Sequence, residues 1–160
     1  MSRSLLLLVA GALIGFLATT PTVSHADYVQ ESASACVADD GDDYFSSNGR
    51  LRNASSTSNL SVACGFPSQT GIRHDSVTFL SVDVYDQSSS ASVIAFACIT
   101  DFNGFSHSCG SSTSTGSSFT GVTSLFPSRS AWSGAGSDYG YIQLTLPPGA
   151  SALHGFYGSN

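Results

Sequence analysis

Acidic side chains are most concentrated in the segment Asp39, Asp40, Gly41, Asp42 and Asp43. Neighbouring carboxylates repel one another, and a hard cation such as Ca²⁺ relieves that repulsion through oxygen ligands. The spacing lacks the alternating ligand positions and the late glutamate of an EF-hand loop. A solvated acidic turn accounts for the same residues. The segment is therefore a candidate calcium site, and a solvated acidic turn is the alternative interpretation. The sequence indicates no other cofactor.

Histidine and serine are the next residue types that could carry chemistry. His74, His107 and His154 follow residue 26, but none lies at a recognised zinc-ligand spacing. The chain contains no Gly-x-Ser-x-Gly sequence, the signature of a nucleophilic serine on a sharp turn. Only geometry identifies a Ser-His-Asp triad among so many serines. The sequence therefore assigns no catalytic residue, and a small extracellular hydrolase stands as the alternative to a protein without enzymatic activity.

Aromatic residues supply the candidates for ligand contact. Phe102 and Phe105 flank an Asn103-Gly104 dipeptide, and Trp132 and Tyr139 flank a glycine-rich loop. Exposed aromatic side chains at the rim of a β-sandwich can contact a sugar ring or a partner protein. The alternative is that each of them folds back onto the hydrophobic core. These four residues are the expected contacts for a carbohydrate or protein ligand.

Four cysteines, Cys36, Cys64, Cys98 and Cys109, predict a framework of disulfides. Cys98 and Cys109 are placed symmetrically about Asn103-Gly104. That dipeptide is a strong hairpin signal, because both residues tolerate the positive φ of a type I′ turn. The hairpin predicts a Cys98–Cys109 disulfide, and Cys36–Cys64 follows by elimination. With all four paired, a thiol nucleophile is not indicated.

The length of the hairpin loop leaves two geometries open. A two-residue turn makes Cys98 and Cys109 a hydrogen-bonded pair with Cα atoms about 5.5 Å apart. A four-residue loop, Phe102 to Phe105, makes them a non-hydrogen-bonded pair with Cα atoms about 4.5 Å apart. A disulfide accepts either spacing, so the predicted pairing holds in both cases.

Short apolar segments separated by turn residues must position these side chains. The expected strands are Leu60–Cys64, Leu80–Tyr85, Val93–Ile99, Tyr141–Leu146 and Ala152–Tyr157. Most alternate apolar and polar residues, as half-buried strands do, whereas 93–99 is apolar on both sides and indicates a central strand. We therefore predict an all-β fold, a single antiparallel β-sandwich of jelly-roll or immunoglobulin-like type.

Two segments between these strands carry weaker patterns. Ser111–Thr120 is rich in serine, threonine and glycine, which predicts a loop or a weak edge strand. Ser128–Asp138 holds the single tryptophan, Trp132, among small residues and is expected to form a surface loop.

The first residues have the order of a secretory leader. Arg3 precedes the apolar run Leu5–Leu17, and small residues lead up to Ala26. As a helix, thirteen residues reach about 20 Å, short of the roughly 30 Å of a membrane core. We expect a cleaved signal peptide at 1–26 and a secreted or periplasmic β-sandwich domain at 27–160, without a stable membrane anchor.

The net charge of the expected mature chain limits the classes of partner that it can bind. Residues 27–160 hold all eleven acidic side chains and four arginines, a net charge of −7, and contain no lysine. Such a surface repels phosphate backbones and anionic lipids. Nucleic acid is therefore not an expected partner.

Several short motifs along the mature chain resemble a family of secreted bacterial proteins of unassigned function, which are small β-sandwiches with two disulfides. The motifs are Ala35-Cys36-Val37, 48–53, Val82-Asp83-Val84-Tyr85-Asp86, Ala97-Cys98, and 144–148 followed by Tyr157. In those relatives the strand before Pro-Pro has a further cysteine where this chain has Leu144 and Leu146, so the second disulfide depends on the hairpin argument. The resemblance implies a fold and a compartment but no activity.

The sequence thus predicts a secreted, disulfide-stabilised binding or structural module. A small hydrolase and a subunit of a cell-surface assembly are the two alternatives.

Overall fold

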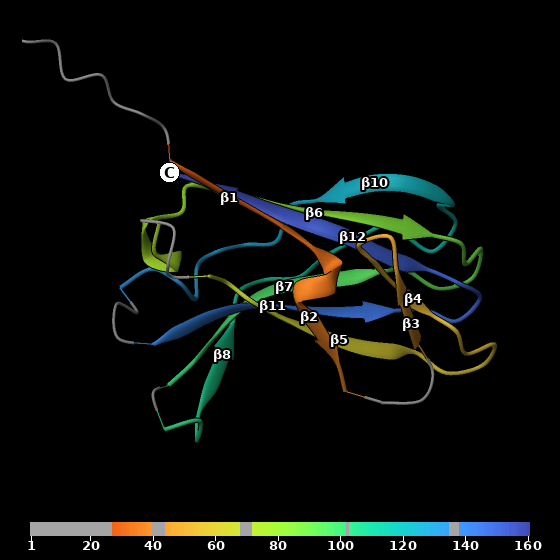
Figure 1. Cartoon of the computed structure of the whole chain (residues 1–160), viewed down its shortest axis with the longest axis horizontal. Helices are drawn as coiled ribbons and strands as arrows, with labels where there is room; N and C mark the ends of the chain where they lie inside the picture. Colours follow the sequence, from red (N-terminus) through yellow and green to blue (C-terminus); the bar gives the residue numbers. More distant parts are fainter. Residues whose placement is uncertain (1–26, 40–43, 68–71, 102, 135–137) are drawn as a thin grey trace, which may run out of the picture.

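Two antiparallel sheets stacked face to face make up the protein (Figure 1). The computed structural model describes residues 27–39, 44–67, 72–101, 103–134 and 138–160. Its two sheets and two disulfides confirm the predicted all-β, antiparallel sandwich. No helix within these described ranges has the length and apolar character needed to cross a membrane.

Sheet A has six strands, in the order β10-β6-β12-β4-β3, with β1 also paired to β12. The strands are β1 (Tyr28–Ser32), β3 (Tyr44–Ser47), β4 (Arg50–Asn53), β6 (Phe79–Asp86), β10 (Gly121–Leu125) and β12 (Ala152–Ser159). The strands β1 and β4 both pair with the same edge of β12. Ala152 and Leu153 of β12 pair with β4, and residues 155–159 pair with β1. Figure 1 shows the C-terminus beside the start of β1, where the backbone N–H of Asn160 donates to the carbonyl oxygen of Asp27.

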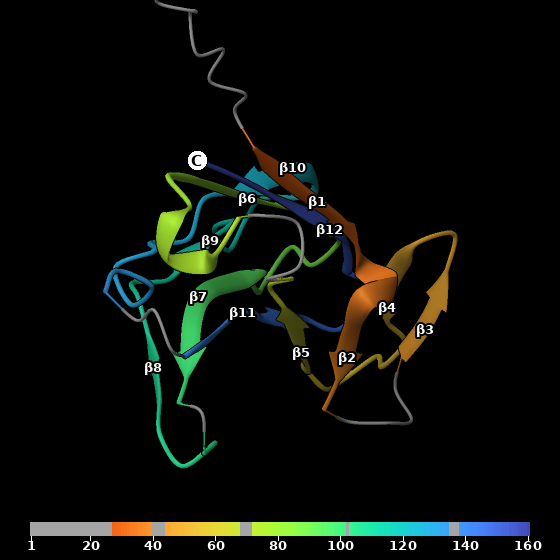
Figure 2. The same ribbon diagram turned by 60° about the vertical axis from the view of Figure 1, so that its left-hand side comes forward.

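Sheet B also has six strands, in the order β2-β5-β11-β7-β8, with β9 paired to β7. The strands are β2 (Cys36–Ala38), β5 (Leu60–Gly65), β7 (Ile94–Thr100), β8 (His107–Cys109), β9 (Thr113–Ser114) and β11 (Tyr139–Leu146). Two short 3₁₀ helices, η1 (Ala33–Ala35) and η3 (His74–Ser76), complete the described elements. Figure 2 shows the β3–β4 hairpin and the β7–β8 hairpin on opposite sides of the molecule.

The five predicted strands correspond to β5, β6, β7, β11 and β12. Their alternating apolar residues face the space between the sheets, where Val62, Val82 and Leu144 are fully buried. The weak segment 111–120 contains the two-residue edge strand β9. Prediction missed β1, β2, β3, β4 and β10. Of these, β1, β4 and β10 each bury a single apolar residue, too few to show a clear period.

A β-bulge in β12 sets the orientation of its side chains. Leu153 pairs with Val84 and Gly155 pairs with Asp83, which leaves His154 without a partner in the ladder. The extra residue lets Leu153 and Phe156, three positions apart, both face the core. His154 is consequently turned to the outer face of sheet A, beside Asp83.

Both disulfides join an edge strand of sheet B to its inner neighbour. Cys36 and Cys64 are paired residues of β2 and β5, with Cα atoms 4.2 Å apart. Cys98 and Cys109 are paired residues of β7 and β8, with Cα atoms 4.0 Å apart. This pairing agrees with the one expected from the sequence.

The loop of the β7–β8 hairpin differs from the expected type I′ turn. Gly104 has a φ of 71°, and its N–H donates to the Asp101 carbonyl at 3.0 Å. The Asp101 N–H donates to the Ser106 carbonyl at 3.0 Å, which closes a four-residue loop. One Asp101 carboxylate oxygen accepts from the N–H groups of Phe105, at 2.8 Å, and Ser106, at 3.3 Å. The two-residue type I′ turn is therefore wrong and the four-residue alternative is confirmed, because the loop closes at Asp101 and Ser106.

Candidate functional site

Two of the predicted contact aromatics are exposed on sheet B. Phe105, in the hairpin loop, is 91% exposed, and Tyr139, at the start of β11, is also exposed. Both lie at the same end of the sheet, because Tyr139 pairs with Thr100, next to the hairpin loop. Phe102 lies outside the described residues.

Trp132 is buried, so its interpretation as an exposed ligand contact is wrong. Its side chain is 1% exposed, and its ring centroid lies 5.1 Å from that of Phe66 and 6.0 Å from that of His74. The indole N–H donates to the carbonyl oxygen of Cys98. The segment predicted as a surface loop, 128–138, thus sends its largest side chain into the core, where its polar group has a partner.

The three histidines lie on different elements and do not converge. His74 is buried in η3 against Trp132, and His107 is exposed on β8. His154 lies on the outer face of sheet A, where it lines two hollows. The histidines that a small hydrolase would draw on are therefore spread over both sheets and a 3₁₀ helix.

The acidic segment is described only in part. Asp39 is exposed beyond the end of β2, and its N–H donates to the carbonyl oxygen of Ser61 at 2.9 Å. Asp40, Asp42 and Asp43 lie outside the described residues. Among the residues that are described, no three His, Cys, Asp or Glu side chains gather closely enough to hold a metal ion.

Four aromatic rings cross the outer face of sheet A in an unbroken row. Successive ring centroids are 5.9 Å apart from Tyr28 to Tyr157, 6.0 Å from Tyr157 to Phe79 and 5.6 Å from Phe79 to Phe126. Tyr28, Phe79 and Phe126 are 61%, 45% and 57% exposed, and Tyr157 is half-buried. We call these four residues the aromatic strip.

The strand order of sheet A creates the aromatic strip. The strands β1, β12 and β6 are direct neighbours, and Phe126 follows the last residue of β10, the next strand along. Side chains on one face of neighbouring strands come within contact distance of each other. Sequence reasoning missed all four residues, because they are spread from position 28 to position 157 and no local pattern links them.

A hollow of about 500 Å³ opens beside the aromatic strip. Phe79 and Phe126 form its apolar wall, and the hydroxyl-bearing residues that line it are Thr78, Ser128, Ser130 and Ser133. Flat apolar surface therefore lies next to groups that can donate and accept hydrogen bonds. Such a combination suits a ligand with apolar faces and polar edges.

A second, smaller hollow of about 270 Å³ continues across the sheet from Tyr157 to His154. The carboxylate of Asp83 lies in it and accepts hydrogen bonds from the hydroxyls of Ser124, at 2.6 Å, and Ser81, at 3.4 Å. Burial lowers the pKa of His154, the positive charge of Arg50 lowers it further, and Asp83 acts in the opposite direction. The imidazole of His154 therefore favours its neutral form.

Comparison with known proteins does not assign the chain to a family. No family model and no curated protein sequence matches the chain. Among solved structures, the chain is similar to a family 11 carbohydrate-binding module from Clostridium thermocellum in complex with a β-1,3-1,4-mixed-linked tetrasaccharide. The sequence identity is 11%, the match covers 82% of this chain and 88% of that chain, and the TM-score is 0.41.

It is also similar to the family 11 carbohydrate-binding module of the cellulosomal cellulase Lic26A-Cel5E of Clostridium thermocellum. There the identity is 12%, the match covers 86% of this chain and 89% of that chain, and the TM-score is 0.39. At these values the likeness says nothing about a ligand for this chain. The resemblance drawn from short motifs is supported only as far as a β-sandwich with two disulfides.

Proposed function

We propose that this protein is a secreted carbohydrate-binding module whose ligand lies along the aromatic strip. The observation that carries the proposal is the unbroken row of four rings, three of them about half exposed, on the outer face of one sheet. Exposed aromatic rings in contact with one another form a large apolar surface on an otherwise polar protein. A surface of this kind indicates that something binds there.

Carbohydrate fits this surface better than a wholly apolar ligand. A sugar ring has an apolar face of C–H groups and an edge of hydroxyl groups. The rings of Phe79 and Phe126 offer flat apolar contacts for the faces, and the hydroxyls of the adjoining hollow offer hydrogen bonds for the edges. A chain of sugars can lie along several rings of the aromatic strip at once.

We also propose that the chain is exported after removal of 1–26. Two disulfides are typical of proteins that fold in an oxidising compartment. Cleavage after Ala26 leaves the whole of β1, which begins at Tyr28, and so retains the first ring of the aromatic strip. Amino-terminal sequencing of the exported protein should begin at Asp27, and a start within Leu5–Leu17 would contradict a leader of this length.

Affinity electrophoresis in gels that contain soluble polysaccharides tests the binding function. The wild-type protein should migrate more slowly in at least one such gel. Phe79→Ala and Tyr157→Ala should each weaken binding on the order of tenfold, because a ring contact contributes about 0.5–1.5 kcal/mol beyond the area it buries. Phe105→Ala is the matched control, because it removes an even more exposed ring from the other sheet.

The melting temperature of each variant shows whether it is folded before its binding is judged. If no neutral or acidic polysaccharide retards the wild-type protein, the carbohydrate proposal is wrong. If folded Phe79→Ala and Tyr157→Ala bind as wild type does and Phe105→Ala does not, the binding surface lies on sheet B instead.

A further inference from the structure

A third hollow, of about 480 Å³, lies at the opposite end of the outer face of sheet A from the aromatic strip. Its polar lining comprises Ser47, Asn48, Arg50, Arg52, Tyr85, Gln87 and His154, and its apolar lining comprises Val122, Ala150 and Ala152. We call it the arginine hollow. Of the described residues that line it, none is acidic, whereas the whole chain has 11 acidic and 5 basic residues. Two of the chain's five basic side chains, Arg50 and Arg52, therefore line this one hollow.

Strand register explains how the arginine hollow forms. Arg52 pairs with Ala152, Ala152 with Tyr85, and Tyr85 with Val122, so one row of side chains crosses β4, β12, β6 and β10. The small side chain of Ala152 leaves space between its larger neighbours. Arg50 lies two residues before Arg52 on β4, and alternation places both on the same face.

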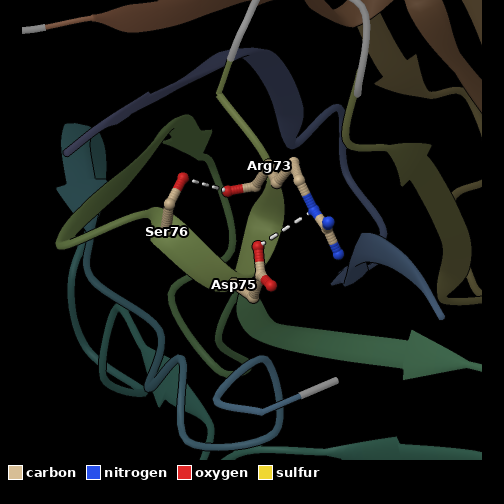
Figure 3. Close-up of polar contacts among 3 residues, drawn as sticks. All are labelled: Arg73, Asp75 and Ser76. Atoms are coloured by element: carbon tan, nitrogen blue, oxygen red, sulfur yellow. Dashed lines mark hydrogen bonds and ion pairs between the residues drawn. The ribbon is translucent and has the colours of Figure 1, made fainter. Parts of the chain in front are cut away.

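The other two arginines of the described chain, Arg73 and Arg129, lie outside the arginine hollow. The side chain of Arg73 turns to Asp75 in η3, with Nε 3.3 Å from Oδ1, and the Arg73 carbonyl accepts from the hydroxyl of Ser76 (Figure 3). Arg129 donates to the carbonyl oxygen of Val77. The outer face of sheet A thus concentrates two guanidinium groups in one hollow, and Arg73 provides a control for a charge at another place.

His154 links the arginine hollow to the small hollow that reaches the aromatic strip. His154 lines both the arginine hollow and the small hollow that holds Tyr157, and the ring of Tyr157 contacts that of Phe79. Phe79 and Tyr85 are six residues apart on β6, a distance of about 20 Å at about 3.3 Å per residue. One extended ligand could therefore touch both.

We propose that the arginine hollow binds an acidic sugar ring of the same glycan chain that lies on the aromatic strip. This inference rests on the proposed function and names the class of ligand. Arginine guanidinium groups match planar or tetrahedral oxyanions through paired N–H donors, so the acidic group is a carboxylate or a sulfate ester. The volume falls within the range of about 300–1,000 Å³ typical of ligand pockets, ample for one sugar ring and its substituent.

The surrounding charges favour an acidic ring in the arginine hollow over the small hollow between it and the aromatic strip. Asp83 and Glu31 line the small hollow between Tyr157 and His154, where they repel an anionic group. The amides of Asn48 and Gln87 line the arginine hollow itself and can bond to sugar hydroxyls. The fitting ligand is therefore a mostly neutral glycan with spaced acidic rings, rather than a continuous polyanion.

Three polymers test this inference by isothermal titration calorimetry. They are glucuronoxylan, the same glucuronoxylan after chemical reduction of its carboxylates to alcohols, and sulfated xylan. The wild-type protein should bind one of the two acidic polymers on the order of tenfold more tightly than the carboxyl-reduced one. Rising salt should diminish this preference, because the arginines are exposed to solvent.

Arginine-to-glutamine variants show which residues cause the preference for acidic polymers. The double variant Arg50→Gln with Arg52→Gln should bind the acidic and the reduced polymers equally. Arg73→Gln removes one arginine charge just before η3, outside the hollow, and should keep the wild-type preference. Tyr157→Ala should weaken the binding of all polymers, since it acts through the aromatic strip.

The outcomes separate this inference from the proposed function. Equal binding of reduced and acidic polymers by the wild-type protein would overturn the inference and leave carbohydrate binding intact. An acidic preference that survives in the double variant would also overturn it. Failure to bind any of the three xylans would overturn this inference, whereas the proposed function fails only if no polysaccharide retards the wild-type protein in the affinity gels. A preference for sulfated xylan alone, lost in the double variant, supports the oxyanion site and identifies a sulfate ester as its ligand.

Discussion

The indole Nε1 of Trp132 donates a hydrogen bond of 2.7 Å to the carbonyl oxygen of Cys98. This contact ties the segment after β10 to the strand that carries the Cys98–Cys109 disulfide. Both partners are buried, so each would lack a hydrogen bond without the other. One side chain thus closes an end of the core and satisfies a backbone group of sheet B.

Replacement of Trp132 by Phe should destabilise the fold. The change removes the N–H donor, leaves the Cys98 carbonyl unpaired and opens a cavity, for a cost of about 2–4 kcal/mol. Urea unfolding followed by circular dichroism measures the difference. Tyr139→Phe, at an exposed position, should change stability by less than about 0.5 kcal/mol. A similarly small change for Trp132→Phe would contradict its assigned place in the core.

Asp86 should be a second stabilising centre, because its buried carboxylate joins three loops to β6. It accepts hydrogen bonds from the Ser88 N–H at 2.9 Å, the Val93 N–H at 3.3 Å, the Ser151 hydroxyl at 3.4 Å and the Thr115 hydroxyl. Asp86→Ala removes the acceptor that these donors share, and among the described residues only the Val93 N–H has a second acceptor, the Thr115 Oγ1 at 3.1 Å.

We expect Asp86→Ala to cost about 3 kcal/mol or more in urea unfolding. The matched control is Asp83→Ala, three residues earlier on the same strand but exposed, with an expected cost below about 1 kcal/mol. Equal costs for the two variants would show that the buried hydrogen bonds of Asp86 do not determine its contribution.

The hairpin loop makes opposite predictions for its two central residues. Gly104 has positive φ and open space around it, so Gly104→Val should cost about 1–2 kcal/mol through backbone strain alone. Asn103 is exposed and lies in a four-residue loop, which does not require a positive φ there, so Asn103→Ala should cost less than about 0.5 kcal/mol. Thermal unfolding of both variants checks this, and a large loss for Asn103→Ala would favour a type I′ turn instead.

His154 should make stability depend on pH. Burial, followed by the charge of Arg50, lowers its pKa in the folded protein below the ordinary value of 6.5. The unfolded chain therefore takes up the proton first as the pH falls, so this contribution to stability is complete above pH 6.5 and declines from there down to the folded pKa.

Urea unfolding at a series of pH values measures that decline. His154→Gln should reduce the loss of stability below pH 6.5, and Arg50→Gln should reduce it in part. An unchanged pH profile in His154→Gln would exclude His154 as its source.

Local sequence was enough to predict the five long strands and the sandwich class. In β6 and β11, apolar residues recur at every second position, and burial of one face requires that period. The spacing of Cys98 and Cys109 about a turn dipeptide was also sufficient for their pairing, because a hairpin joins residues close in the chain. These features depend on interactions between residues that lie within about a dozen positions of each other in the chain. A local sequence pattern is therefore enough to predict them.

Only the tertiary structure decided the binding surface. Tyr28, Phe79, Phe126 and Tyr157 meet because β1, β6 and β12 are neighbours in sheet A, with β10 beside them. That strand order depends on the packing of the whole core, and no residue carries a local signal for its partner in a distant strand. The bulge at His154 and the burial of Trp132 have the same origin, since each satisfies contacts with segments far away in the sequence.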